Sequence, residues 1–392
     1  MKKDTPRLVT LLFASSIAGM GGGVIIPAMP QILEHFQDVP NAELLVRLFL
    51  TTPGLFTAIG APLAGIIVDK YGRKNLLIFA IFLYGLGGTT GCYLDSLYAL
   101  MVGRALLGLS AAGTMTTCVT LMADYYDAKS RQKLMGYQFS VTSFGSTIFL
   151  ALGGILTEIH WRAPFFIYTI PFLIFIAAIF FIIEPQKKEH QRLIQKETPK
   201  EKFPYLLLGS IYLLIYTTMA IFYLKVVIFP FYMNEIEPTS STKVGLALSL
   251  AVCISALVSL KYGFIKSRLS YIHISLAVFI LTAIGYLILY SAGNYWVALI
   301  GLIVTSLGFG MFAPNVTVWV NAVTPETYRG RAVGGMTTCI FLGMFSSPLI
   351  AHPLTLYFSL AETYAIAALF LLGISAIFIS YSLKTFLIRT FT

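Results

Sequence analysis

Three ionisable side chains stand inside long apolar stretches of this sequence, where they could handle a charge or a proton: Arg104, Lys225 and His352. A charge in an apolar, membrane-like setting is costly unless it is paired or hydrated, so such residues are candidates for a solute or ion pathway. Arg104 could steer protons or hold an anion, or it could be a structural arginine bonded to helix carbonyls. Lys225 could serve the same pathway or could extend to the membrane surface along its alkyl chain. His352 could titrate near neutral pH or could be a hydrogen-bonded packing residue.

Polar and aromatic side chains near the middle of the same stretches form a second set. Tyrosine offers an apolar ring with a polar tip, which suits loose recognition of flat or greasy solutes. Together with the three ionisable residues, this set is predicted to line a cavity for substrate and protons: Met20, Gln138, Thr142, Tyr212, Tyr216 and Asn315.

Acidic side chains are absent from the middle of the apolar stretches. All 17 Asp and Glu residues can be placed in loops or at helix ends. A cavity without a buried carboxylate has little to attract a lipophilic cation. The sequence therefore favours an anionic, zwitterionic or neutral amphipathic solute.

The stretches themselves are long enough to cross a bilayer. Hydrophobic residues make up 57% of the 392 positions and charged residues 11%, whereas soluble domains carry about 25% charge. About 20 apolar residues cross the hydrocarbon core as a helix, and only a helix satisfies its own backbone there. We predict an all-α polytopic membrane protein with twelve transmembrane helices, at residues 8–30, 44–68, 75–93, 97–122, 132–156, 163–183, 205–232, 244–262, 271–291, 295–320, 332–357 and 361–383.

One polar stretch, 184–203, divides these helices six to six. The loops after the fourth and tenth helices form a weak internal repeat, since both run from an acidic turn through basic residues to a glycine. Paired halves around a central site are typical of secondary transporters. We predict two pseudo-symmetric six-helix bundles, residues 1–183 and 205–392, joined by a cytoplasmic linker at 184–204.

The net charge of +10 follows from membrane topology. With the N-terminus inside, most Lys and Arg residues fall on one side of the membrane, as the positive-inside rule requires. This indicates cytoplasmic termini and a multi-pass protein of a bacterial inner membrane. It also removes the reason to expect a nucleic-acid partner.

The loop after the second helix carries the strongest motif, Gly65-Ile-Ile-Val-Asp69-Lys-Tyr-Gly72-Arg73-Lys74. Here the sequence resembles the major facilitator superfamily, whose signature loop is Gly-x-x-x-Asp-Arg-x-Gly-Arg-Lys. The resemblance implies that Asp69 faces the start of the eleventh helix, after Gly330, where the helix dipole favours an anion. That contact would latch the cytoplasmic side shut. The conformational latch is predicted to comprise Gly65, Asp69, Gly72, Arg73, Lys74, Asp124 and Arg131.

Other passages resemble the drug–proton antiporter branch with twelve helices. The first helix ends Ile26-Pro27-Ala-Met-Pro30, and the fourth carries Gly103-Arg104-Ala-Leu-Leu-Gly108. One departure is the fifth helix, where Phe149-Leu150 replaces the Gly-Pro of the branch's exporter motif. Export is thus implied by the general resemblance and not by this marker.

These observations predict a secondary active transporter that exports a small amphipathic compound, such as a drug or metabolite, in exchange for protons by alternating access. An importer of an anionic or neutral nutrient or metal chelate is the alternative, and a receptor or scaffold without transport is the weakest. We expect no enzyme activity, no cofactor and no metal, a proton gradient as the driving force, and a monomer in the lipid bilayer.

Overall fold

The computed structural model describes residues 5–185, 204–325 and 328–391, without the side chains of 18, 69, 128, 129, 131–133, 139 and 377–391. The regular elements of this part are helices. Ten of them are long and apolar enough to cross a membrane, and Thr5–Ile17 and Leu360–Ala376 are shorter apolar helices. The fold class predicted from the sequence is thereby confirmed. The helices are α1 (Thr5–Met20), η1 (Gly23–Ala28), α2 (Met29–His35), α3 (Ala42–Tyr71), α4 (Arg73–Thr89), η2 (Thr90–Cys92), α5 (Leu97–Tyr125), α6 (Ala128–Thr157), η3 (Ala163–Thr169), α7 (Ile170–Phe181), α8 (Tyr205–Phe222), α9 (Leu224–Ile236), α10 (Ser241–Leu260), α11 (Tyr262–Lys266), α12 (Tyr271–Tyr290), α13 (Tyr295–Val323), α14 (Arg329–Tyr357) and α15 (Leu360–Phe391).

Two of the predicted continuous helices are interrupted near their middle by turn residues. The first splits into α1, η1 and α2 around a turn at Gly21 and Gly22. Consecutive glycines have poor helix propensity, and Pro27 within η1 cannot donate a backbone hydrogen bond. The seventh splits into α8 and α9 at Tyr223.

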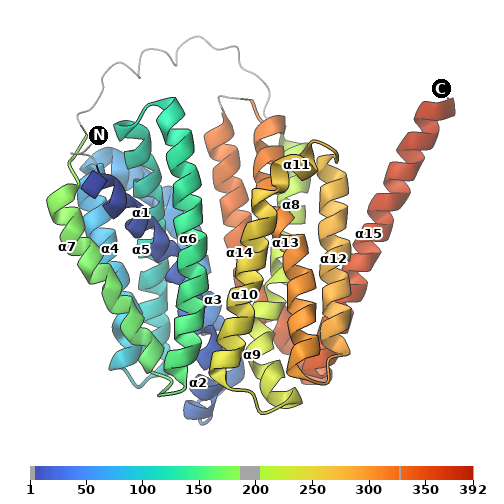
Figure 1. Ribbon diagram of the computed structural model, residues 1–392, viewed down its shortest axis with the longest axis horizontal. Helices are drawn as coiled ribbons and strands as arrows, with labels where there is room; N and C mark the ends of the chain where they lie inside the picture. The colour runs from blue at the N-terminus through green and yellow to red at the C-terminus, as the bar shows by residue number, and fades with distance from the viewer. Residues whose placement is uncertain (1–4, 186–203, 326–327, 392) are drawn as a thin grey trace.

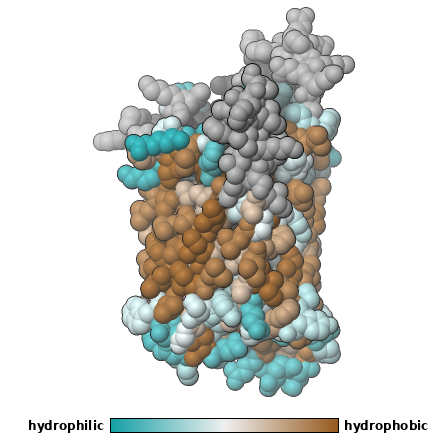
Figure 2. All heavy atoms as spheres, turned by 90° about the vertical axis from the view of Figure 1, so that its right-hand side faces the viewer, coloured by the Kyte–Doolittle hydropathy of each residue, from teal (hydrophilic) through white to brown (hydrophobic). Residues whose placement is uncertain are grey.

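The helices form two side-by-side groups, α1–α7 and α8–α15 (Figure 1). The groups touch mainly where α3 packs on α14 and α6 packs on α10. The space-filling view shows an apolar belt between two more hydrophilic ends, as a membrane-spanning surface requires (Figure 2). We call the end where α1 begins and α15 ends the termini end, and the other the α2 end. The domain bounds at 184–204 stay a prediction, because residues 186–203 lie outside the described part.

Small residues let the helices approach closely in both groups. A Cβ on Gly87 would lie 2.6 Å from the carbonyl oxygen of Gly103, and one on Gly285 would lie 2.7 Å from that of Gly301. The two pairs are equally spaced along the chain, so the repeat seen in the loops extends into the packing of α4 on α5 and of α12 on α13.

A glycine pair also joins the two groups at the α2 end. A Cβ on Gly154 of α6 would lie 2.7 Å from the Ser241 carbonyl oxygen and 3.1 Å from Gly245 Cα in α10. Nearby, Glu158 accepts a 2.9 Å hydrogen bond from the backbone N–H of Thr242. The α2 end is therefore closed by direct backbone contact.

Substituting Gly154→Ala should push α6 and α10 apart at this end, because overpacking costs about 1–3 kcal/mol. A spin-label pair on the two helix ends should report a longer distance. Gly209→Ala in α8 is the control, since a Cβ there meets no atom within 4 Å. Equal distances in both variants would contradict the closure.

Outside the spanning segments, Asp95 bridges two basic side chains at the α2 end. Its Oδ1 lies 2.7 Å from His35 Nε2 and 2.7 Å from Arg162 Nη2. The His35 hydrogen bond, followed by the charges of His35 and Arg162, lowers the pKa of Asp95 below its ordinary value. A lowered carboxyl pKa stabilises the fold above the ordinary value, and this stability is lost as the pH falls through the lowered one.

We expect Asp95→Asn to lower the melting temperature at neutral pH. The difference from the wild type should shrink as the pH falls below about 4, and it should vanish only below the lowered pKa of Asp95, where the folded wild-type carboxyl is also neutral. Thermal unfolding across this pH range checks it. A difference in melting temperature that stays constant from neutral pH through the whole acid range would show that the charge of Asp95 is unimportant.

Candidate functional site

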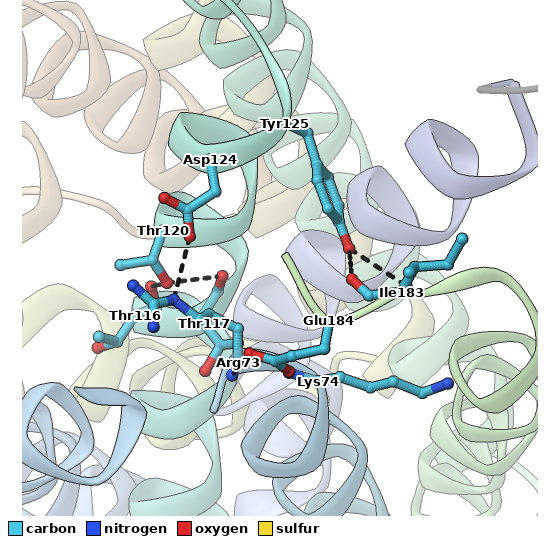
Figure 3. Close-up of polar contacts among 9 residues, drawn as sticks. All are labelled: Arg73, Lys74, Thr116, Thr117, Thr120, Asp124, Tyr125, Ile183 and Glu184. Carbon is cyan, nitrogen blue, oxygen red and sulfur yellow. Dashed lines mark hydrogen bonds and ion pairs between the residues drawn. The ribbon is translucent and has the colours of Figure 1, made fainter. Parts of the chain in front are cut away.

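The loop between α3 and α4 is held by a carboxylate from the end of the first group (Figure 3). Gly72 has φ +90°, a conformation that side chains rarely adopt. Glu184 accepts hydrogen bonds from the backbone N–H groups of Arg73 (2.8 Å) and Lys74 (2.7 Å). It therefore caps the start of α4, where free N–H groups and the helix dipole favour an anion. A Cβ on Gly72 would also lie 2.9 Å from Glu184 Oε1. Both the backbone conformation and the lack of space for a side chain therefore require glycine at this position.

The basic side chains of this loop also bind within the first group. Arg73 Nε donates to Asp124 Oδ2 of α5 at 3.0 Å, and Lys74 Nζ donates to the Ile179 carbonyl of α7 at 3.0 Å. Five predicted latch residues are thus located, with Gly65 beside open space. The side chains of Asp69 and Arg131 lie outside the described ones, so the contact of Asp69 with the start of α14 stays a prediction.

Arg104 is 1% exposed and lies in an aromatic cage at the break of the first helix. Its Nη1 donates to Tyr168 Oη at 2.9 Å and to the Gly21 carbonyl at 3.2 Å. The guanidinium carbon lies 4.6 Å from the ring centre of Phe49 and 5.2 Å from that of Phe165. Its Nη2 is buried and has no hydrogen-bond partner among the described residues. Arg104 thus makes the carbonyl contact that a structural arginine would make, and its Nη2 group remains without a hydrogen-bond acceptor among the described residues.

Lys225 does not extend to the membrane surface, which was one of its two predicted alternatives. It is 4% exposed, because α9 directs it onto the hydroxyls of Thr305 and Ser306 in α13, at 3.0 and 3.3 Å from Nζ. Asn315 is 0% exposed, and its amide is occupied by Tyr262, the Tyr271 carbonyl and Ser275. It packs α11 and α12 onto α13, so a role in lining the cavity has no support in these contacts.

The other predicted cavity residues are spread over several helix contacts. Tyr212 donates to the Ala332 carbonyl at 2.7 Å, and Tyr216 donates to Ser346 at 2.9 Å, which ties α8 to α14. Thr142 donates to the Ser15 carbonyl at 3.3 Å. The remaining three are Met20, which is buried, Gln138, which is half-buried, and His352, whose Nδ1 is buried without a hydrogen-bond partner among the described residues.

A cavity of ≈ 80 Å³ lies where the two broken helices meet. Gly21 and Gly22 from the first break and Tyr223 from the second are on its wall. The described wall also includes residues of α3, α5 and α14: Leu50, Thr51, Pro53, Gly54, Thr57, Leu107, Ala111, Met115, Phe341 and Met344. None of the nine residues that were predicted to line a cavity is on this wall, although Met20 precedes Gly21 in the chain and Arg104 donates to its carbonyl. Hydropathy does not reveal where a helix breaks.

Sequence reasoning missed two charged residues. Arg47 was not proposed as a functional residue. It is 1% exposed, donates to Thr355 of α14 at 2.8 Å, pairs with Glu43 and lies 5.6 Å from the Phe231 ring centre. It links the two groups near the α2 end. The spacing of Glu43 and Arg47 by one helical turn was a usable signal. Glu184 was assigned to the linker, and no sequence signal marked it as a cap.

Substituting Glu184→Gln should loosen the start of α4, because each carboxylate oxygen accepts from one N–H group and the amide replaces one of these oxygens with an NH2 group that cannot accept. An N-terminal cap contributes about 0.5–2 kcal/mol, so amide hydrogen exchange at Arg73 and Lys74 should accelerate. Glu235→Gln is the control, since Glu235 is exposed and makes no hydrogen bond within the described structure. Unchanged exchange in the Glu184 variant would show that the cap is not formed.

Comparison with known proteins places this geometry in a family. The tetracycline resistance protein, class H, of Pasteurella multocida is 24% identical over 88% of this chain and 87% of its own length. The quinolone resistance protein NorA of Staphylococcus aureus is 26% identical over 89% of each chain. The multidrug resistance protein 1 of Bacillus subtilis is 33% identical over 50% of this chain and 51% of its own.

Solved transporter structures share the fold. A bacterial homologue of the human lysosomal transporter Spinster, inward-facing and occupied, matches with a TM-score of 0.78 and 14% identity over 99% of this chain and 98% of that one. A D-xylose–proton symporter matches with a TM-score of 0.75 and 16% identity, over 93% of this chain and 96% of that one. The sequence profile described as Major Facilitator Superfamily matches residues 11–348 and 212–386. The chain therefore belongs to the major facilitator superfamily and is a secondary active transporter that works by alternating access.

Proposed function

We propose that this transporter exports a small amphipathic compound from the cytoplasm in exchange for protons. The observation that carries the proposal is the cavity of ≈ 80 Å³ at the breaks of the first and seventh helices, here called the central cavity. Transporters of this kind bind their solutes near the membrane midplane at discontinuous helices. The names of the relatives supply the direction, since they describe resistance to tetracycline, to quinolones and to several drugs.

In this proposal the termini face the cytoplasm and the α2 end faces the outside of a bacterial inner membrane. The backbone contact of Gly154 with α10 and the Arg47 link to α14 then close the outer side. The described conformation would be the one that loads solute from the cytoplasm. The loop at Gly72, with Asp69 against α14, would latch the cytoplasmic side when the halves rock. We propose that a single chain suffices, because the cavity is built within it.

The charges around the cavity favour an anionic, zwitterionic or neutral solute. Arg104 and Lys225 are buried, whereas no Asp or Glu with a described side chain is buried. Arg104 keeps one unpaired donor beside Gly21, and Gly21 is on the cavity wall. An anionic group of the solute would use this donor in a charge-assisted hydrogen bond.

Substituting Arg104→Lys should weaken solute binding while the protein stays folded, because lysine lacks the planar fork. Loss of one hydrogen bond to a charged group costs about 1.5–3 kcal/mol, or about 10–100-fold in Kd. Arg104→Ala should abolish binding. Solute affinity and thermal stability would be measured on the same purified proteins, with Arg162→Lys as a control distant from the cavity. Normal affinity in an unstable Arg104 variant would show a structural role only.

The proposed function is tested by proton release from the purified protein across a panel of compounds, beginning with tetracycline and a quinolone. We expect at least one compound to release protons on binding and to leave loaded vesicles faster when the outside is acidic. Transport in the opposite direction, with proton uptake, would instead establish the importer. Binding of no compound, in a folded protein, would favour a receptor or scaffold.

A further inference from the structure

Lys225 occupies a site that accommodates an amine in either protonation state. It lies two residues after the break at Tyr223, and its Nζ is 3.9 Å from the ring centre of Phe222. Two hydroxyl oxygens face it, Thr305 Oγ1 at 3.0 Å and Ser306 Oγ at 3.3 Å. Lys225 does not itself line the central cavity, whereas Tyr223, two residues earlier, does.

The direction of the hydroxyl protons shows what these oxygens offer. Thr305 donates to the Leu302 carbonyl at 2.8 Å, and Ser306 donates to the same carbonyl at 2.7 Å. Their lone pairs are thereby left to accept from Nζ. An ammonium group is satisfied by two such acceptors and an aromatic face, and a neutral amine can donate both of its N–H groups to the same oxygens. The site binds both forms without rearrangement.

No carboxylate fixes the charge of Lys225 within the described structure. Arg47 and Arg104, the other two buried cations, cannot lose a proton in a protein, whereas a desolvated lysine can. Exchange of a solute for a proton needs a group that changes its protonation during the cycle. We propose that Lys225 carries the coupled proton, an inference that rests on the proton-coupled transport proposed above.

The step involves one proton and no other bond change. When the α2 end opens, the lone pair of Nζ takes a proton from hydronium in the outer water and forms an N–H bond. When that end closes, the N–H bond breaks, the proton passes to water on the cytoplasmic side, and the neutral amine remains on Thr305 and Ser306. Closure drives the release, because a charge removed from water without a carboxylate partner is unfavourable.

Other ionisable groups near Lys225 do not replace it. Tyr286 of α12 donates to the Ile221 and Phe222 carbonyls and contacts Tyr364 of α15. The elements packed on α9 carry these other charged or titratable side chains: Glu34 and His35 on α2, Lys243 on α10, Arg329, Arg331 and His352 on α14, and Glu362 on α15. In the described structure none of these makes an ion pair or hydrogen bond with the Lys225 amine. His352 is the competing candidate, because its Nδ1 is buried and unbonded.

The test uses full-length protein in vesicles and two substitutions that fix the charge. Lys225→Arg is permanently positive, and Lys225→Met is neutral and of similar length. For one exchanged proton, a gradient of one pH unit drives about a tenfold solute ratio. We expect this ratio in the wild type and a ratio of about one in both variants. Lys261→Met, at an exposed lysine, should keep the wild-type ratio. A ratio of about one in His352→Gln together with a wild-type ratio in Lys225→Arg would overturn the inference and assign the proton to His352.

A second measurement is the number of protons released per molecule of solute bound by the purified protein. It can be made even on a variant that transports too slowly for the vesicle assay. We expect about one for the wild type and none for Lys225→Arg. Thr305→Val, which removes one acceptor, should move the pH midpoint of release to lower pH. A gradient-driven ratio in Lys225→Arg equal to that of the wild type would overturn the inference alone. A wild type without any proton-linked transport would overturn the proposed function instead.

Discussion

Among the described side chains, basic residues are buried in this transporter and no acid is buried with them. Arg47 and Arg104 are each 1% exposed and Lys225 is 4% exposed. Arg104 and Lys225 are held by neutral groups, namely a carbonyl and a phenol for Arg104 and two hydroxyls for Lys225. Arg47 is held by a threonine hydroxyl and by the partly exposed carboxylate of Glu43. Aromatic faces complete all three sites. Because removing a charge from water is expensive, these sites determine which solutes and which conformations are favourable.

The helix breaks and the buried charges belong to one arrangement that occurs in both halves. In the first half, Arg104 of α5 reaches the carbonyl at the break of the first helix, while Tyr84 donates to Ile17 at 2.8 Å in the turn before it. In the second half, Lys225 follows the break and reaches α13, while Tyr286 donates to Ile221 at 2.6 Å. The tyrosines and the cations anchor the interrupted backbone. The cavity lies between these two anchored breaks, which explains why the interruptions are tolerated at membrane depth.

Hydropathy predicted the spanning segments well, because about 20 apolar residues must cross the bilayer as helix. It could not predict the breaks, since the glycines at 21–23 and the interruption at Tyr223 leave the apolar character unchanged. Arg104 was identified from the free-energy cost of placing a charge within the membrane. Its partners could not be predicted, because Tyr168 and Gly21 come from distant parts of the chain. For the same reason, the hydrogen bonds that join Asn315 to α11 and α12 and the burial of Arg47 could not be predicted.

The central claim is that the buried charge of Arg104, with no buried acid among the described side chains, sets the substrate class. The most direct test is equilibrium binding of matched amphipathic compounds that share one aromatic body and differ only in bearing a carboxylate, an uncharged amide or a quaternary ammonium group. The purified wild-type protein should bind the carboxylate and the amide and should bind the ammonium compound at least about tenfold more weakly, a difference of about 1.4 kcal/mol. Tighter binding of the ammonium compound would contradict the account, because it would require a buried acid that the described side chains do not provide.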